Sequence, residues 1–263
     1  MKVFLESEEL KKSVFEILDY SYPYPQGNEI PSRTSVTQIK ELTIERMANE
    51  ESEFTRPVYE PDNRRSSSDD MAELMFSPLH VKPAFMREKG EKAANEIGTL
   101  YHLVMSEINL SLIREKGIEC IDGEIDRLIS DGTVSEEDRG YIDVDKIKAF
   151  YKSGLGQRLL ASKEIHRETP FQINISATEY NPALGDEYKD ETVILQGIID
   201  CFFEENGNYI LLDYKTDKVK NNSNEIKIKY LKQLELYTKA IETLTDKKVA
   251  ESRLYLFDTD EVV

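Results

Sequence analysis

The sequence predicts an α/β protein in which a mainly helical first half precedes a sheet core. Apolar residues recur at helical spacing over much of residues 1–165, whereas strand-like alternation begins near residue 166. The second half then reads as a strand, a hairpin of two strands, a helix and a last strand. We therefore expect a single domain over residues 1–263, with the α/β core in residues 166–263.

The first half predicts several helices separated by one long loop. Residues 35–38 (S-V-T-Q) match a capping box in front of the amphipathic run 39–47. Prolines and a Ser/Asp-rich run predict a solvated loop over residues 51–72. Helical spacing resumes near Arg87 and continues to Ile108. Shorter helices are expected at residues 110–117, 123–130, 135–142, 144–151 and 155–162.

The second half predicts strands rich in Ile, Val and Phe around one hairpin turn. The E-E-N-G-N segment at residues 204–208 has the residue types of a tight β-turn, so the strands on either side should pair. A helix should follow, because its apolar residues recur every three or four positions. The expected elements are strand 169–176, loop 182–190, strand 192–203, strand 209–214, helix 226–244 and strand 253–257.

Composition indicates a globular chain and sets one difficulty for a nucleic-acid function. The 263 residues include 51 acidic and 34 basic ones, giving a net charge of −17, whereas DNA-binding proteins are usually basic. Carboxylates that bind metal ions would account for part of this excess. Cys120 and Cys201 are too few for a disulfide framework. No signal peptide or membrane span is recognisable, so we expect a cytoplasmic protein.

The residues with the clearest chemical potential lie on the predicted hairpin. Asp213 and Lys215 are two apart on a strand, so their side chains share a face while Tyr214 points away. The turn between the strands should bring Asp200 close to Asp213. Two adjacent carboxylates repel each other unless a cation lies between them, and oxygen ligands favour Mg²⁺ or Mn²⁺ over zinc.

Each of these residues also has an ordinary interpretation. Asp-x-Lys alone is common at exposed strand ends, and the paired Asp200 is what favours a site. His102 is either a metal ligand or a helix-face histidine. Gln233 and Tyr237 share a helical face, where they could hold a phosphate or the lysine, or form a half-buried polar edge. Glu168 is a weaker candidate for the same site.

Four motifs stand in a fixed order along the chain. They are G-T-L-Y-H at 98–102, Q-G-I-I-D at 196–200, L-D-Y-K-T-D at 212–217 and Q-L-E-L-Y at 233–237. This set resembles the RecB-type branch of the PD-(D/E)xK nuclease superfamily, and within it the C-terminal nuclease domains of AddA-type helicase–nuclease proteins. Shorter matches at residues 35–37, 82–85 and 167–171 extend the resemblance over nearly the whole chain.

The resemblance implies a fold and a role for each motif residue. The fold would be a restriction-endonuclease-like mixed sheet flanked by helices. His102, Asp200 and Asp213 would bind a divalent metal ion, assisted by the carbonyl of Tyr214. The catalytic set would be Asp200, Asp213, Lys215, Gln233 and Tyr237. Apart from the resemblance, we expect Glu168 and Asp217 as secondary site residues.

The resemblance also implies a reaction and partners. We expect Mg²⁺- or Mn²⁺-dependent hydrolysis of single-stranded DNA, acting on the 3′-ended strand, in double-strand break repair and recombination. The helicase part of AddA and an AddB-type subunit would be the partners. The chain has no P-loop motif, so no ATP site is expected, and two cysteines cannot hold an iron–sulfur cluster.

Two other functions remain open at this point. The acidic composition is compatible with a catalytically degenerate module that guides or docks DNA. A site-specific endonuclease of the same superfamily would keep the chemistry but would need a basic element that reads bases, and none is recognisable.

Overall fold

The computed structural model forms two compact units, of which the larger carries every predicted site residue. The smaller unit contains residues 174–194 and the described residues up to Thr34, and the larger contains the rest. A single domain over residues 1–263 stays a prediction. The structure describes residues 27, 30–54, 94–218 and 223–263. Most of the predicted loop, the start of the helix expected from Arg87 and the motif at 82–85 lie outside them.

The sheet is mixed, as predicted for the core. Within the described residues its strand order is β1-β3-β4-β5-β6, and β2 also pairs with β3. β3 and β4 are antiparallel, whereas β4 and β5 are parallel and are connected through a helix. The strands are β1 (Arg33–Ser35), β2 (Ile165–Ser176), β3 (Thr192–Glu205), β4 (Asn208–Lys215), β5 (Val249–Leu256) and β6 (Glu261–Val262).

The predicted hairpin is formed by β3 and β4. Asn206 and Gly207 occupy its two-residue turn with φ of 53° and 84°, the left-handed conformations that a type I′ turn requires. The register pairs Cys201 with Leu212, so one further step along each strand places Asp200 opposite Asp213. The turn therefore fixes which residues meet at the far end of the hairpin.

The helices largely follow the predicted pattern. In the capping box, the Ser35 amide donates to Oε1 of Gln38 at 2.9 Å and the Gln38 amide donates to Oγ of Ser35 at 3.2 Å. The helices are α2 (Val36–Phe54), α4 (Ala94–Glu107), α5 (Leu110–Lys116), α6 (Ile121–Ser130), α7 (Val144–Lys152), α8 (Gly154–Ala161), α9 (Ala177–Tyr180) and α10 (Ser223–Thr245).

A few elements differ from the prediction. Helix α2 continues to Phe54 rather than ending near residue 51, because no glycine or proline interrupts it. The helix expected at 135–142 is a 3₁₀ helix, η4 (Glu136–Tyr141). Two further 3₁₀ turns, η3 (Ile118–Cys120) and η5 (Asp186–Tyr188), were not predicted. Strands β1 and β6 were also missed, because two or three residues are too few for a periodic pattern.

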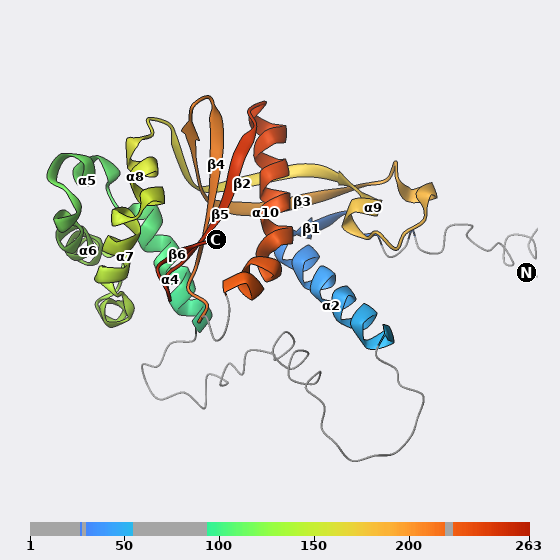
Figure 1. The fold of residues 1–263 in the computed structure, drawn as a ribbon, viewed down its shortest axis with the longest axis horizontal. Helices are drawn as coiled ribbons and strands as arrows, with labels where there is room; N and C mark the ends of the chain where they lie inside the picture. Colours follow the sequence, from blue (N-terminus) through green and yellow to red (C-terminus); the bar gives the residue numbers. More distant parts are fainter. Residues whose placement is uncertain (1–26, 28–29, 55–93, 219–222) are drawn as a thin grey trace, which may run out of the picture. The chain divides into compact units, whose positions relative to one another are not determined.

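Helices of the larger unit cover the two faces of β4 differently. Ile210, Leu212 and Tyr214 point into the apolar core that this strand shares with α4–α8. The intervening residues, including Asp213 and Lys215, therefore point to the opposite face, where α10 packs on β4, β5 and α2 (Figure 1). The alternation that was predicted for this strand thus separates the core from the polar residues.

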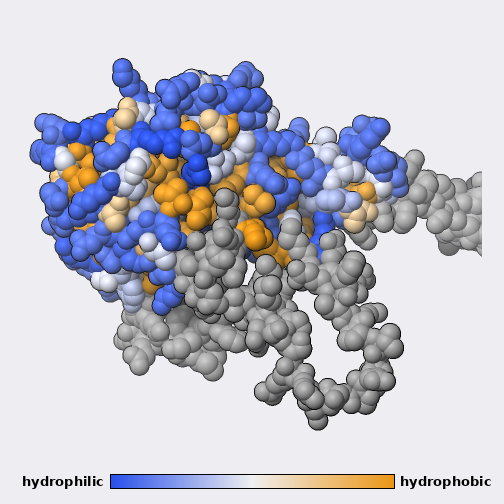
Figure 2. Space-filling model, in the orientation of Figure 1, coloured by the Kyte–Doolittle hydropathy of each residue, from blue (hydrophilic) through white to orange (hydrophobic). Residues whose placement is uncertain are grey.

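Hydrophilic residues dominate the face of the described residues seen in Figure 2. This agrees with a chain in which charged residues make up 32% of the sequence. Among the helices that the structure describes, none combines the length and the apolar composition needed to cross a membrane.

Candidate active site

The β3–β4 hairpin positions the two predicted aspartates side by side. Their side chains share one face because residues directly opposite each other in an antiparallel pair point the same way. Asp200 is also held by the neighbouring strand, since the Tyr214 amide donates to its Oδ2 at 2.9 Å. Both carboxylates are buried. The hairpin therefore concentrates negative charge in a place that water does not reach well.

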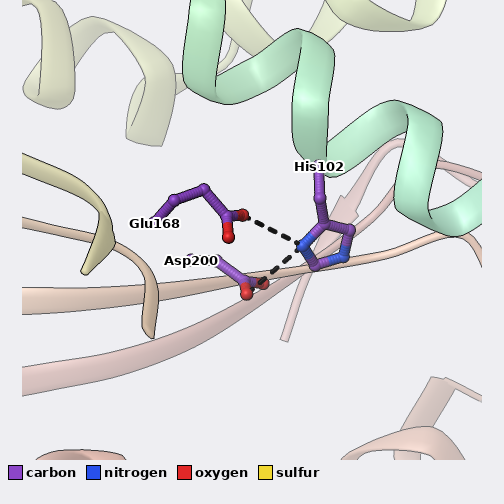
Figure 3. Close-up of side chains that lie close together, drawn as sticks. All are labelled: His102, Glu168 and Asp200. Atoms are coloured by element: carbon purple, nitrogen blue, oxygen red, sulfur yellow. Dashed lines mark ion pairs between the residues drawn. The ribbon is translucent and has the colours of Figure 1, made fainter. Parts of the chain in front are cut away.

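His102, Glu168 and Asp200 converge from three different elements (Figure 3). The same Nδ1 atom of His102, on α4, lies 3.2 Å from Oδ1 of Asp200 and 3.6 Å from Oε1 of Glu168, on β2. One possible ligand atom from each residue lies within 4.8 Å of the others. Among the described residues this is the group of His, Cys, Asp and Glu with the spacing of a metal site.

The neighbouring carboxylates of Asp200 and Glu168 repel each other, and His102 lies between them. Burial opposes protonation of His102, but its hydrogen bonds to Asp200 and Glu168 raise its pKa to about 10. The pKa of Asp200 is lowered even though burial opposes this, because His102 stabilises its ionised form. In the metal-free protein the positive charge on His102 thus offsets the negative charges of the two carboxylates, as a bound metal ion would.

Glu168 reaches this group through an unusual backbone conformation. Its φ is +43°, in the left-handed region that non-glycine residues seldom adopt, although it lies within strand β2. Such a conformation costs on the order of 1–3 kcal/mol and is concentrated at functional sites. The regular alternation of buried and exposed side chains in β2 begins only after this point. No sequence pattern marks this kink, which explains why Glu168 was only a weak candidate.

Asp213 lies at the centre of a buried polar network. Its Oδ2 is 2.6 Å from Nζ of Lys215, and its Oδ1 accepts a hydrogen bond from Nε2 of Gln233 at 2.8 Å. The same amide nitrogen donates to the hydroxyl of Tyr237 at 3.2 Å. Burial raises the pKa of Asp213, and the nearby charge of Asp200 acts in the same direction. Gln233 and Tyr237 thus support the carboxylate from α10, as their shared helical face allowed.

Asp217 lies at the entrance to the loop that follows β4 and binds a different part of α10. Its carboxylate accepts from Nζ of Lys229 at 2.8 Å and from the hydroxyl of Tyr230 at 2.9 Å. The ammonium group of Lys215 lies 4.5 Å from the centroid of the Tyr230 ring. Asp217 therefore holds the Tyr230 ring beside Lys215.

A family comparison shows which superfamily the chain belongs to. The model of the PD-(D/E)XK nuclease superfamily matches residues 79–262, which include all of the site residues described above. The chain belongs to this superfamily. The family that the four ordered motifs predicted is thereby confirmed, and so are the mixed sheet and its flanking helices.

Curated relatives of this nuclease domain are components of larger enzymes. The chain is 36% identical, over 95% of its own length, to an ATP-dependent helicase/nuclease subunit of Thermoanaerobacter sp. (strain X514). It is 35% identical, over 98% of its length, to the corresponding helicase/nuclease subunits of Clostridium novyi (strain NT) and Clostridium botulinum (strain Kyoto / Type A2). The chain spans about a fifth of the length of these relatives, which is 19%, 19% and 18% respectively.

The donor atoms of this candidate site fit a divalent cation. Oδ2 of Asp213 is buried and accepts no hydrogen bond of good geometry from the described residues, although Lys215 lies close to it. A buried carboxylate oxygen needs a charged partner, which Nζ of Lys215 supplies at 2.6 Å and which a divalent cation could also supply. Carboxylates of Asp200 and Glu168 and an imidazole complete a set suited to Mg²⁺ or Mn²⁺. Asp213 itself lies outside the three-residue group.

The structure brings most of the predicted site residues together, and it adds a cluster of lysines around Tyr230 that the sequence did not indicate. Three lysines surround the ring of Tyr230, and one of them, Lys215, pairs with Asp213. Only Lys215 among them belongs to the recognised motifs. Lys40 belongs to α2, and the sequence pattern around it indicated only an amphipathic helix. The signal in the sequence was its position two residues after the capping box, which fixes where the first turn of that helix begins.

Proposed function

We propose that this chain is a divalent-metal-dependent DNA nuclease that hydrolyses phosphodiester bonds. The observation that carries the proposal is the convergence of His102, Asp200 and Glu168 beside the buried Asp213–Lys215 pair, in a member of a nuclease superfamily. His102, Asp200 and Asp213 would hold the ion, with Glu168 and the carbonyl of Tyr214 as further oxygen donors. Mg²⁺ and Mn²⁺ suit these donors.

The remaining side chains position the reacting groups. Lys215 points from the same face as Asp213, so its ammonium group can orient the attacking water or stabilise negative charge on the phosphate. Gln233 holds Asp213 in place and is itself fixed by Tyr237. When bound, the metal ion supplies Lewis acidity to the phosphate and lowers the pKa of a bound water. Asp217 and Tyr230 limit the positions open to Lys215.

The names of the relatives support a proposal about the substrate and the partners. Because those relatives are ATP-dependent helicase/nuclease subunits, we propose that the chain acts on single-stranded DNA delivered by a helicase. The 3′-ended strand, the helicase part of AddA and an AddB-type subunit complete this proposal, with a role in double-strand break repair and recombination. Delivery by a motor would explain how a domain with a net charge of −17 obtains a polyanionic substrate.

Digestion of labelled DNA tests the proposed activity. Linear single strands labelled at the 3′ or the 5′ end should be shortened in Mg²⁺ or Mn²⁺ and should stay intact in EDTA. The label that is released first gives the polarity, and circular single strands separate exonuclease from endonuclease activity. Intact DNA with every divalent metal would contradict the proposal and favour a docking module. Cleavage of circular duplexes at one sequence would favour a site-specific endonuclease.

Metal affinity should increase with pH. His102 has a pKa of about 10 in the metal-free protein, so an ion that binds its imidazole must displace a proton throughout the range from pH 6 to 9. One displaced proton makes the dissociation constant fall by about tenfold for each pH unit. Calorimetric titration with Mn²⁺ at pH 6, 7 and 8 measures the dissociation constant. Repeating it in buffers with different ionisation enthalpies measures the number of protons released on binding.

A second histidine provides the control for this titration. His166 stacks on Phe202 and contacts Glu164, and it does not belong to the three-residue group. The variant His166→Gln should keep the full pH dependence, whereas His102→Gln should lose most of it and bind Mn²⁺ more weakly. An affinity for Mn²⁺ that is the same at all three pH values in the wild type would show that His102 is not a ligand.

A further inference from the structure

Three lysines surround the ring of Tyr230 next to the proposed active site. The ammonium nitrogens of Lys40, Lys215 and Lys229 lie 4.7, 4.5 and 5.1 Å from the ring centroid. Lys40 comes from α2, whereas Lys229 and Tyr230 belong to α10, and the two helices pack against each other in the larger unit. Two carboxylates, those of Asp213 and Asp217, lie beside these three ammonium groups, so the cluster keeps one excess positive charge in a chain with a net charge of −17.

Two of the three lysines already have a carboxylate partner. Lys215 is paired with Asp213 at 2.6 Å, and Lys229 is paired with Asp217 at 2.8 Å. Within the part of the chain that the structure describes, Lys40 forms no ion pair, although it is half-buried. Burial lowers the pKa of Lys40, and the charges of Lys215 and Lys229 lower it further. A bound anion would relieve both effects.

The start of α2 explains why the side chain of Lys40 lies beside the ring of Tyr230. The reciprocal hydrogen bonds of Ser35 and Gln38 fix the first turn of the helix. Ile39 is 1% exposed and anchors the same turn in the core, so the neighbouring position is held with little freedom. An ammonium group that is held in position loses less entropy on binding than one on a free surface lysine.

We propose that Lys40 binds a backbone phosphate of the DNA strand next to the phosphate that is hydrolysed beside Lys215. This inference rests on the proposed nuclease function and adds a substrate-binding residue to it. Lys40 and Lys215 share one aromatic ring, so a single strand can contact both through neighbouring phosphates. The ligand is the phosphodiester backbone and not a base, because a lysine offers a charge without a pattern that reads sequence.

Binding of single-stranded DNA in EDTA tests this step without hydrolysis. The variant Lys40→Met keeps the aliphatic stem and removes the charge, and Lys152→Met is the matched control at an exposed position on α7. Lys40→Met should weaken binding by about tenfold at low salt and should reduce the slope of log affinity against log salt by about 0.7, as expected for one lost phosphate contact. Lys40→Arg should restore both values, and Lys152→Met should change neither.

Uncharged phosphates identify the contact. Methylphosphonate linkages placed one at a time along the strand should weaken wild-type binding at one position near the cleavage point, and Lys40→Met should lose nothing further there. Equal affinity and equal salt slope for wild type and Lys40→Met would overturn the inference, even if the wild type cleaves DNA. Binding that depends on Lys40 in a protein that cleaves no DNA would support the inference and contradict the nuclease proposal.

Discussion

Replacing Asp213 by asparagine is expected to abolish DNA hydrolysis without unfolding the protein. The amide has nearly the shape of the carboxylate and can still accept the hydrogen bond from Gln233, but it lacks the charge that would hold a divalent ion. Lys215 keeps a second carboxylate nearby, because Asp200 also stabilises its charged form. We expect the initial rate in saturating Mg²⁺ to fall by about a thousandfold or more.

An exposed aspartate supplies the matched control. Asp190 is an exposed residue of the smaller unit, so Asp190→Asn makes the same chemical change away from the site. Its rate should equal that of the wild type, and circular dichroism should give the same spectrum for both variants. An Asp213→Asn protein that keeps more than a tenth of the wild-type rate would remove Asp213 from the set of metal ligands.

The aspartates could be predicted because their placement depends on local rules. A two-residue turn sets the register of a hairpin, and strand alternation sets the face of each side chain. Asp200, Asp213 and Lys215 therefore needed only the residues between 200 and 215 to be placed. His102 reaches Asp200 only because α4 packs on the sheet, which local periodicity does not predict. The order of the four motifs along the chain was what indicated that His102 belongs to the site.

The parts that were missed depend on contacts between distant segments or on backbone strain. Lys40 and Tyr230 meet only because α2 packs on α10, and no pattern within either helix indicates the other. Glu168 joins His102 through a left-handed backbone conformation, which strand alternation cannot predict. The prediction that Gln233 and Tyr237 share a helical face is confirmed by their hydrogen bond. The sequence suggested a phosphate or the lysine as the partner of this pair, whereas Gln233 binds Asp213.

Replacing Phe150 by alanine is expected to cause a large loss of stability. Its ring is fully buried and makes edge contacts with Tyr151, Tyr214 and Tyr255 at centroid distances of 4.9, 5.4 and 4.8 Å. It thereby joins α7 to strands β4 and β5. Removing it leaves a cavity that rigid aromatic neighbours fill poorly, so the free energy of unfolding should fall by about 3–5 kcal/mol. Urea denaturation measures this change.

The same substitution tests whether the apolar core positions the active site. Tyr214 lies between Asp213 and Lys215 in the chain, its amide holds Asp200, and its ring contacts both Phe150 and His102. Phe150→Ala should therefore lower the hydrolysis rate even at temperatures where the protein remains folded, and Phe150→Leu should lie between it and the wild type. Leu103→Ala, at a side chain that is 36% exposed, should change stability by less than about 1 kcal/mol. A fully active Phe150→Ala protein would show instead that the β3–β4 hairpin alone holds the carboxylates in place.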